Sequence, residues 1–393
     1  MRTVIVGGGV AGMTAALDLA RRDVGEVLVF CDEVHPYYYR PQLTEVLAGS
    51  LTPEKLVRRP LSYYAARNIH VSLGTPVTGL DTDRKVIATQ DGREVGYDRL
   101  LLATGSMPFV PPAEGSDKIG VRTWRTLDDT LALAQTAAGC QEIIVIGGGL
   151  LGLEAARGLR SLCPQVTVVE YFPRLMPRQL DVEGAQLLQS FVESLGIRVL
   201  VGAQVRDILG DERVSGVALK DGRCLPAQVV LVAAGVRCNS SLAAAAGITV
   251  DRGILVDDYL QTSAPDTYAA GDAALYRGHS WAIAPIAQAQ ARVAAANIAG
   301  DRVAYDIVVP STTLKIVGID VASIGITLPE DSDCEEIRGM DAEHGVYRKI
   351  VLRDGVIVGT IAINDKNLAK DLESRIAQQA RLTRSEAEAL VSK

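Results

Sequence analysis

The chain opens on the stretch MRTVIVGGGVAG, residues 1–12, in which the apolar run Thr3–Val6 enters the pattern G-x-G-x-x-G at Gly7, Gly9 and Gly12. This spacing is typical of a strand that turns into a helix around a dinucleotide. The first glycine makes the tight turn, the second lets the backbone approach a pyrophosphate, and the third lets the helix pack on the strand. Glycine-rich turns also join strands to helices without any ligand, so the motif alone predicts only a candidate site.

The residues that follow complete a βαβ unit of about thirty residues, as the fingerprint requires. We expect a helix over Met13–Arg22 and a strand over Glu26–Phe30. An acidic residue is expected at the end of that strand to hold a pair of ribose hydroxyls. Cys31 stands there instead, with Asp32 and Glu33 just beyond, which leaves the ribose contact of this unit open.

The same pattern returns one domain length later, at Gly147, Gly149 and Gly152. Here the second strand of the unit ends in Glu170, where a carboxylate would hold a ribose 2′-hydroxyl and repel a 2′-phosphate. The second unit is therefore predicted to prefer NADH, although Arg174 lies close enough in sequence to leave NADPH possible. The alternative is a glutamate that is merely exposed at a strand end.

Each half of the repeat continues into short strands with turn residues between them, which predicts inserted β-meanders that begin at Val71–Leu73 and Arg198–Leu200. Two similar halves indicate two nucleotide-binding domains. The predicted fold class is α/β, with two Rossmann-like dinucleotide-binding domains that carry β-meanders. From Asp306 the pattern changes to strands followed by helices, which predicts a C-terminal α+β domain.

Three further segments are candidates for ligand binding. Tyr37–Tyr39 precede Arg40 and Pro41, and this segment either packs on itself or forms the wall of a site for a flat aromatic ligand. Asp272 follows a buried strand and a glycine, where it can accept bonds from a polyol chain or cap the next turn. The helix expected from Pro285 to Ile298 would present an N-terminus that stabilises an anion.

Composition excludes several classes of function. A chain of 393 residues is expected to form two or three domains. The net charge of −7 argues against a nucleic-acid partner, and no apolar run of about 18 residues could span a membrane. The N-terminus enters a strand at once, which leaves no room for a secretory signal. Six cysteines without a close pair predict reduced thiols in a cytoplasmic protein and no metal site.

These motifs, in this order, resemble the flavoproteins built on the glutathione reductase plan, and the resemblance covers nearly the whole chain. It implies that the first fingerprint binds the FAD pyrophosphate and that the second binds NADH. It also implies an FAD-binding domain over residues 1–112 and 238–304, an NADH-binding domain over 113–237 and a C-terminal interface domain over 305–393. The residues expected to bind cofactor are Gly7, Gly9, Gly12, Glu33, Arg40, Pro41, Ala103, Thr104, Gly105, Gly147, Gly149, Gly152, Glu170, Gly271, Asp272 and Pro285.

Within this family the chain is most similar to NAD(P)H:rubredoxin oxidoreductases and to the flavin-bearing part of NADH-dependent nitrite reductases. The matching stretches are Tyr39–Leu43, Arg174–Asp181 and Ser311–Lys315. Disulfide reductases of this plan carry the cysteine pair C-x-x-x-x-C after the second strand, and coenzyme A disulfide reductases and water-forming NADH oxidases carry one cysteine near Arg40–Leu47. This chain has none there, so the resemblance implies a flavin site without a thiolate relay.

The leading hypothesis is a hydride relay, in which NADH reduces the flavin and the flavin passes electrons singly to a small acidic iron–sulfur protein such as rubredoxin. Candidate catalytic residues are Arg40 and Lys315, as cations near the reduced flavin, and Glu154, which matches a glutamate near the nicotinamide. Docking of the acceptor needs a local basic patch, for which Lys55, Arg58 and Arg59 are candidates; the alternative is an ordinary solvated helix end.

Two other functions stay open at this point. The chain could be an NADH oxidase or diaphorase that reduces oxygen or quinones. It could also be a redox-sensing flavoprotein similar to apoptosis-inducing factor, in which binding of NADH changes the contacts with partners. A monomer and a homodimer are both compatible with the pattern, since residues 306–363 could form a dimer interface or the dock for the acceptor.

Overall fold

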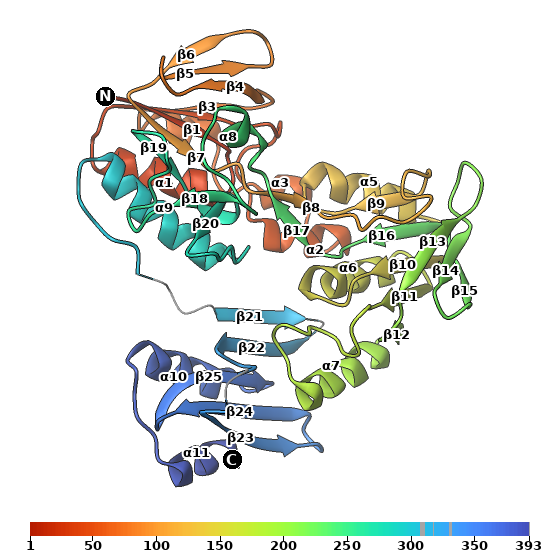
Figure 1. Cartoon of the computed structure of the whole chain (residues 1–393). Coiled ribbons are helices and arrows are strands. Elements are labelled where there is room, and N and C mark those ends of the chain that lie inside the picture. Colours follow the sequence, from red (N-terminus) through yellow and green to blue (C-terminus); the bar gives the residue numbers. More distant parts are fainter. Residues whose placement is uncertain (307–310, 317, 330–331, 393) are drawn as a thin grey trace. The chain divides into compact units, whose positions relative to one another are not determined.

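The computed structural model describes residues 1–306, 311–316, 318–329 and 332–392, with the backbone alone for 312–316 (Figure 1). The first sheet is parallel and has the order β19-β7-β1-β2-β3. Its strands are β1 (Arg2–Val6), β2 (Glu26–Phe30), β3 (Ile69–Ser72), β7 (Arg99–Leu102) and β19 (Thr267–Ala269). The strands are apolar runs because both faces of the sheet are buried, one against helices and the other largely against the β-meander of this half.

Helices α1 (Val10–Arg21) and α9 (Ala284–Ile298) pack together and share a hydrophobic core with this sheet. Small side chains let them approach closely, and Ala15, Ala291 and Ala294 are fully buried. The meander of this half is β4 (Val77–Asp81), β5 (Val86–Thr89) and β6 (Glu94–Gly96).

The second sheet is also parallel, with the order β12-β11-β10-β16-β9. Its strands are β9 (Val121–Thr123), β10 (Glu142–Ile146), β11 (Gln165–Val169), β12 (Ile197–Leu200) and β16 (Val229–Val232). The accompanying helices are α5 (Leu127–Ala137), α6 (Leu150–Arg160) and α7 (Val182–Ser194), and the meander consists of β13 (Val205–Leu209), β14 (Gly216–Leu219) and β15 (Cys224–Pro226). The predicted α/β fold with two such halves is confirmed.

The prediction that the meanders begin at Val71–Leu73 and Arg198–Leu200 is wrong. β3 extends the first parallel sheet beside β2, and β12 extends the second beside β11. Each of these strands follows a helix or a helical segment, so it returns to the sheet as a parallel crossover strand rather than as a hairpin. Each meander therefore begins one strand later.

The C-terminal sheet is antiparallel, with the order β21-β22-β25-β24-β23. Helices α10 (Lys366–Ala377) and α11 (Arg384–Val391) cover one of its faces through an aliphatic core. Strand β23 (Cys334–Asp341) was not predicted from the sequence. The other strands are β21 (Ser311–Ile316), β22 (Ile319–Gly325), β24 (Val346–Arg353) and β25 (Val356–Ile363).

Short elements connect these layers. They are η1 (Arg40–Gln42), α2 (Leu43–Leu47), α3 (Pro53–Leu56), α4 (Leu61–Ala65), β8 (Ser106–Pro108), β17 (Val236–Cys238), α8 (Ser241–Ala245), β18 (Ile254–Val256), η2 (Gly271–Ala273) and β20 (Ala274–Tyr276). None of the described helices combines the length and the apolar character that a membrane crossing demands.

The chain divides into two compact units. The first consists of Met1–Leu43, Leu51–Met107 and Val236–Val308, and the second of Thr44–Ser50, Pro108–Gly235 and Val309–Lys393. The C-terminal sheet therefore belongs to the same unit as the second parallel sheet. The predicted domain boundaries at residues 112, 237 and 304 stay a prediction.

Candidate functional site

The first glycine turn joins β1 to α1, and the backbone around it explains each glycine. Gly7 has a left-handed φ of +112°, and a Cβ atom there would lie 2.1 Å from the carbonyl oxygen of Ala103. A Cβ atom on Gly12 would lie 1.9 Å from the carbonyl oxygen of Gly7. Among the described residues, a Cβ atom on Gly9 would meet nothing within 4 Å. The middle glycine therefore borders open space, while the other two are required by packing.

The second turn, between β10 and α6, repeats this geometry. Gly147 has a φ of +117° and packs against the carbonyl oxygen of Ala233, and Gly152 packs against that of Gly147. Gly149 again borders open space among the described residues. Both helices start without a side-chain cap and without an acidic residue in their first turn. Their N–H groups are therefore free to bind an anion, and both turns fit the pyrophosphate of a dinucleotide.

Glu170 lies at the end of β11 and is held in place by the backbone of its own unit. The N–H of Gly148 donates to its Oε2 atom over 2.5 Å, and the N–H of Phe172 donates to its Oε1 atom over 2.8 Å. The side chain is buried. Since each carboxylate oxygen accepts more than one bond, Glu170 keeps acceptor capacity for ribose hydroxyls.

Arg174 is engaged within the loop that follows. Its Nε atom donates to the carbonyl oxygen of Leu180 and its Nη2 atom to that of Pro177, both over 3.0 Å. Two of its three nitrogen atoms are therefore bound to the backbone. Arg174 is therefore less available to bind the 2′-phosphate of NADPH.

Cys31 takes the place of Glu170 in the first unit. It follows β2 as Glu170 follows β11, and Val6 pairs with Phe30 as Ile146 pairs with Val169. A Cβ atom on Gly8 would lie 2.2 Å from the Cys31 sulfur, so the thiol fills the space beside this turn. Burial, together with the charges of Asp32 and Glu33, raises the pKa of Cys31 to about 12. The thiol is neutral at physiological pH and supplies no carboxylate to a ribose.

Glu33 and Arg40, both predicted at the cofactor site, form an ion pair. The Arg40 Nη2 atom lies 2.6 Å from the Glu33 Oε1 atom, and the hydroxyl of Tyr38 also donates to Glu33. Pro41 follows in η1. Because Glu33 balances the guanidinium charge, Arg40 provides less net positive charge near a flavin than an unpaired arginine would.

Three predicted FAD segments lie together in the first unit. The backbone of Ala103 contacts Gly7, and a Cβ atom on Gly271 would lie 2.9 Å from that of Ala11 in α1. Gly271 also has a left-handed φ of +79°, and its N–H donates to Gln290 Oε1 over 2.8 Å. Gln290 is a buried residue of α9, which links this turn to that helix.

Polar side chains that the sequence analysis missed support these segments. The hydroxyl of Ser106 donates to Asp272 Oδ2 over 2.7 Å, and the hydroxyl of Thr104 donates to the carbonyl oxygen of Asn239 over 2.6 Å. The N–H of Asn239 in turn donates to the carbonyl oxygen of Gly105. Ser106 and Asn239 bind partners more than 130 positions away in sequence, so no local pattern reveals them. Gln290 did give a local signal, because it is a polar residue among the apolar residues of α9.

Helix α9 begins in the same unit, with Pro285 in its first turn. It has neither an acidic residue in that turn nor a side-chain cap. Its first N–H groups are thus available to an anion. This geometry fits the predicted role of Pro285 at the flavin.

Glu154 lies in α6, where α2 packs against that helix. A Cβ atom on Gly158 would lie 2.9 Å from the Leu47 side chain. Burial and the nearby carboxylate of Glu45 raise the pKa of Glu154 to about 7, although the Thr44 hydroxyl and Arg157 oppose the rise. Glu154 can therefore exchange a proton at neutral pH. Lys315 lies on β21, and its side chain falls outside the described residues.

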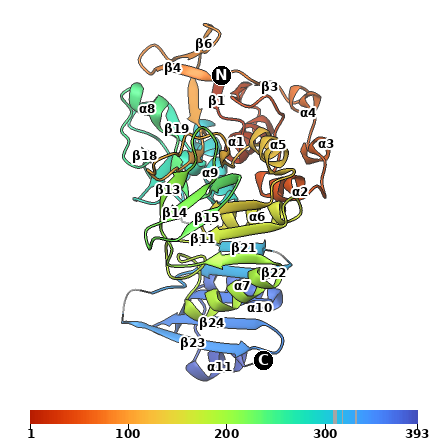
Figure 2. The same ribbon diagram turned by 90° about the vertical axis from the view of Figure 1, so that its right-hand side faces the viewer.

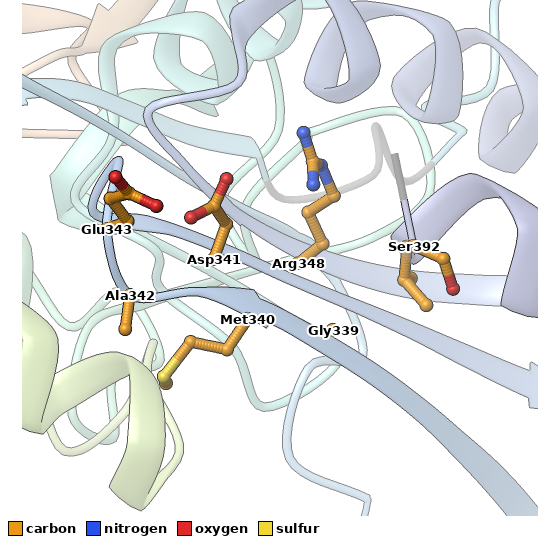
Figure 3. A pocket seen from close by; sticks show the side chains of 8 residues that line it. Gly339, Met340, Asp341, Ala342, Glu343, Arg348 and Ser392 are labelled. Atoms are coloured by element: carbon orange, nitrogen blue, oxygen red, sulfur yellow. The ribbon is translucent and has the colours of Figure 1, made fainter.

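A hollow of about 550 Å³ lies elsewhere, on the C-terminal sheet (Figure 3). Its lining includes Asp341 and Glu343 from the β23 end and Arg348 from β24. Arg348 is paired with Asp365 over 2.7 Å. The hollow contains none of the residues predicted to bind a cofactor. Among the described side chains, no group of three or more His, Cys, Asp or Glu could hold a metal ion.

Comparison with known proteins gives consistent results. Residues 1–291 match the model of the pyridine nucleotide-disulphide oxidoreductase family, and residues 310–380 match the rubredoxin NAD+ reductase C-terminal domain. The nitrite reductase [NAD(P)H] of Bacillus subtilis is 38% identical over 96% of this chain, which spans 47% of that protein. The ferredoxin–NAD(+) reductase component of the biphenyl dioxygenase system of Paraburkholderia xenovorans is 35% identical over 92% of this chain and 89% of its own length.

The fold comparison agrees with the sequence comparison. The putidaredoxin reductase–putidaredoxin complex has a TM-score of 0.91 with this chain at 28% identity, covering 100% of this chain and 96% of that one. The resemblance inferred from the motifs is thus confirmed. The chain belongs to the pyridine nucleotide-disulphide oxidoreductase family, whose cofactors are FAD and NAD(P)H.

Proposed function

We propose that this chain is an FAD-dependent NADH oxidoreductase that delivers electrons to a small iron–sulfur protein. The observation that carries the proposal is the pair of glycine turns. Each has an open middle glycine at an uncapped helix N-terminus, and one of them lies beside the buried carboxylate of Glu170. Two such turns in one chain fit two dinucleotides.

The two units differ in the groups that they offer. The first presents Asp272, which Ser106 orients, and the start of α9, which together suit a polyol chain and an anionic ring system. The second presents Glu170, which suits a ribose without a 2′-phosphate. We therefore assign FAD to the first unit and NADH to the second. When bound, these cofactors supply hydride and single-electron transfer, while the protein binds and orients them.

The absence of cysteine from residues 32–139 supports an electron path without a thiol. The first unit's flavin loop, Tyr37–Pro41, contains no group that could form a disulfide with a substrate. Glu154, with its raised pKa, is the candidate for holding a proton within the second unit. Electrons would then leave to a protein or small-molecule acceptor rather than to a disulfide.

A basic surface on the first unit suits an acidic protein acceptor. Arg59 and Arg67 flank α4, and their guanidinium carbons lie 4.0 and 3.7 Å from the centroid of the Tyr63 ring on that helix. Within the described part of the chain, neither forms an ion pair. Arg58 contacts the Tyr39 ring, next to the flavin loop. We call Arg58, Arg59 and Arg67 the arginine surface; with Lys55, it offers charge complementarity to an acidic iron–sulfur protein such as rubredoxin.

Two matched substitutions test the cofactor assignment. Gly9 and Gly149 both have ordinary φ values and open space at the Cβ position, so alanine should be tolerated by the fold but should occupy the room for a pyrophosphate. We expect Gly9→Ala to lose bound flavin, measured by absorbance at about 450 nm. We expect Gly149→Ala to keep flavin and to lose reduction by NADH. The assignment is wrong if both variants lose flavin but are still reduced by NADH, or if neither variant loses flavin or reduction by NADH.

Stopped-flow mixing tests the acceptor. The protein is reduced with NADH and then mixed with rubredoxin, with oxygen or with a neutral quinone. Fast transfer to rubredoxin and slow transfer to oxygen are expected. Faster oxidation by oxygen would favour an NADH oxidase, and a long-lived reduced complex with every acceptor would favour a sensor.

A further inference from the structure

The loop between β11 and α7 begins after Glu170 and ends at Asp181, and its first half is bound to the second glycine turn. The N–H of Met176 donates to the carbonyl oxygen of Gly148 over 3.0 Å. A Cβ atom on Gly148 would lie 2.6 Å from the Leu175 side chain, and Leu175 and Met176 are fully buried. The position of this loop is therefore tied to the position of the turn that carries the Gly148 N–H.

The second half of the loop is bound to the C-terminal sheet. Oδ1 of Asp181 accepts from the N–H of Gly184 and caps α7. Its Oδ2 atom accepts from the hydroxyl of Tyr347 over 2.6 Å and lies 3.2 Å from Nζ of Lys349. Burial acts to raise the pKa of Asp181, but the bonds from Tyr347 and Gly184 and the charge of Lys349 hold it below its ordinary value. Asp181 is thus an ionised group shared by α7 and the sheet.

Gln179, two positions before Asp181, makes a second attachment. The hydroxyls of Ser323 and Thr327 donate to the carbonyl oxygen of Gln179 over 3.0 and 3.2 Å. Helix α7, which Asp181 starts, contacts β24 of the same sheet, as Figure 2 shows. The sheet therefore binds the loop through both a backbone carbonyl and a side-chain carboxylate.

Successive side chains of β24 point to opposite faces of the C-terminal sheet. Along β24, Tyr347 and Lys349 point to the loop, while Arg348 between them lies on the opposite side and pairs with Asp365 at the start of α10. Lys349 is 1% exposed and also lies 3.0 Å from Glu336 on β23. A buried lysine is costly unless it is paired. Its charge therefore acts on the two carboxylates it touches, one of which ends the nucleotide loop.

We propose that the C-terminal sheet positions the nucleotide-binding turn of the second unit, with Lys349 and Tyr347 as positioning residues that act through Asp181 and the loop 171–181. This inference rests on the proposed NADH site. An aliphatic residue at position 349 would fill the same space. What Lys349 adds to packing is therefore the ion pair, which fixes the location of Asp181. The sheet then controls how Gly148 and Glu170 meet the dinucleotide.

The test compares two charge-removing substitutions on the same strand, Lys349→Met and Arg348→Met, in the full-length protein with its flavin. Lys349→Met removes the ion pairs with Asp181 and Glu336, and Arg348→Met removes the ion pair with Asp365, so only the first substitution touches the loop. The binding of ADP-ribose, which needs no turnover, is measured by titration calorimetry, together with KM and kcat for NADH with a neutral quinone. Tyr347→Phe removes the hydroxyl with the least change in shape and guards against a variant that fails to fold.

For Lys349→Met we expect an increase of about 10-fold in the dissociation constant of ADP-ribose and in KM, since the loop loses a charged hydrogen bond. The expected increase for Tyr347→Phe is smaller, about 3-fold, while kcat and flavin content stay unchanged in both. Arg348→Met should leave the affinity unchanged. Equal losses in the Arg348 and Lys349 variants, or no loss in either Lys349→Met or Tyr347→Phe, would overturn the proposal. If the unsubstituted protein binds no ADP-ribose, the proposed function fails instead.

Discussion

The N–H of Gly148 and the carboxylate of Glu170 are joined by a hydrogen bond of 2.5 Å, so the glycine turn itself sets the position of the acid that follows β11. Replacement of Glu170 by alanine removes the group that would bind the ribose. A charged hydrogen bond contributes about 1.5–3 kcal/mol. We expect kcat/KM for NADH to fall about 10-fold to 100-fold, and the preference for NADH over NADPH to narrow.

Steady-state kinetics with both coenzymes and a neutral quinone measure this change. Flavin content serves as the control, because Glu170 lies in the second unit. An unchanged ratio of the two kcat/KM values would contradict the assigned role of Glu170.

The cysteines differ in their expected reactivity. Cys31 is buried and its pKa is raised to about 12, mainly by burial, whereas Cys224 is exposed. Because the thiolate is the reactive form, iodoacetamide at pH 8 should label Cys224 and leave Cys31 unlabelled in the native protein. Peptide mass spectrometry distinguishes the two sites, and labelling in denaturant confirms that both are accessible when unfolded. Labelling of Cys31 before Cys224 would show that the first unit opens in solution.

Glu154 predicts a dependence of stability on pH. Its pKa rises from 4.5 to about 7 on folding, so the native state binds this proton more tightly than the unfolded state does. The stabilising contribution is complete below about pH 4.5 and is lost as the pH rises through 7, a change of about 3 kcal/mol. Glu154→Gln should remove this dependence, so that its melting temperature exceeds that of the unsubstituted protein at pH 8. If the melting temperature changes between pH 5 and pH 8 by the same amount in both proteins, this prediction is contradicted.

The arginine surface predicts how an acidic acceptor docks. Charge reversal at Arg59 and Arg67 should lower kcat/KM for rubredoxin about 10-fold at low ionic strength, and the loss should shrink in 0.5 M salt, where surface charges are screened. Arg84→Glu with Arg93→Glu is the matched control, because these arginines lie in or beside the meander of the same unit and pair with Glu94 and Asp91. Equal losses in both double variants would point to overall charge rather than to a docking surface.

Much of the fold could be predicted because its strongest signals are local. Twelve residues suffice to recognise a buried strand that enters G-x-G-x-x-G, and the repeat of this pattern predicts the second unit. Strand β23 escaped because Glu335, Glu336 and Arg338 interrupt its apolar pattern, and the structure pairs Glu336 with the buried Lys349. Glu336 thus meets its partner on another strand and Glu335 meets Arg384 in α11, and no local pattern reveals these pairs.

The candidate site divides in the same way. The glycines follow from backbone geometry, which the motif encodes. Ser106 and Asn239 act on residues more than 130 positions away, and Lys349 finds Asp181 across a similar separation. The pairing of Arg40 with Glu33 was also not anticipated, although the two lie close in sequence, because a loop without regular periodicity does not reveal which side chains meet.

Seven residues near the start of the chain, Thr44–Ser50, belong to the second compact unit although the residues on both sides belong to the first. Leu47 covers Gly158 of α6 there. A continuous fragment that starts at Pro108 would thus lack the segment that packs against α6 of the same unit. If the nucleotide-binding unit were exchanged between relatives, these seven residues would have to be exchanged with it. Otherwise Gly158 would be left uncovered on α6, the helix that follows the second glycine turn.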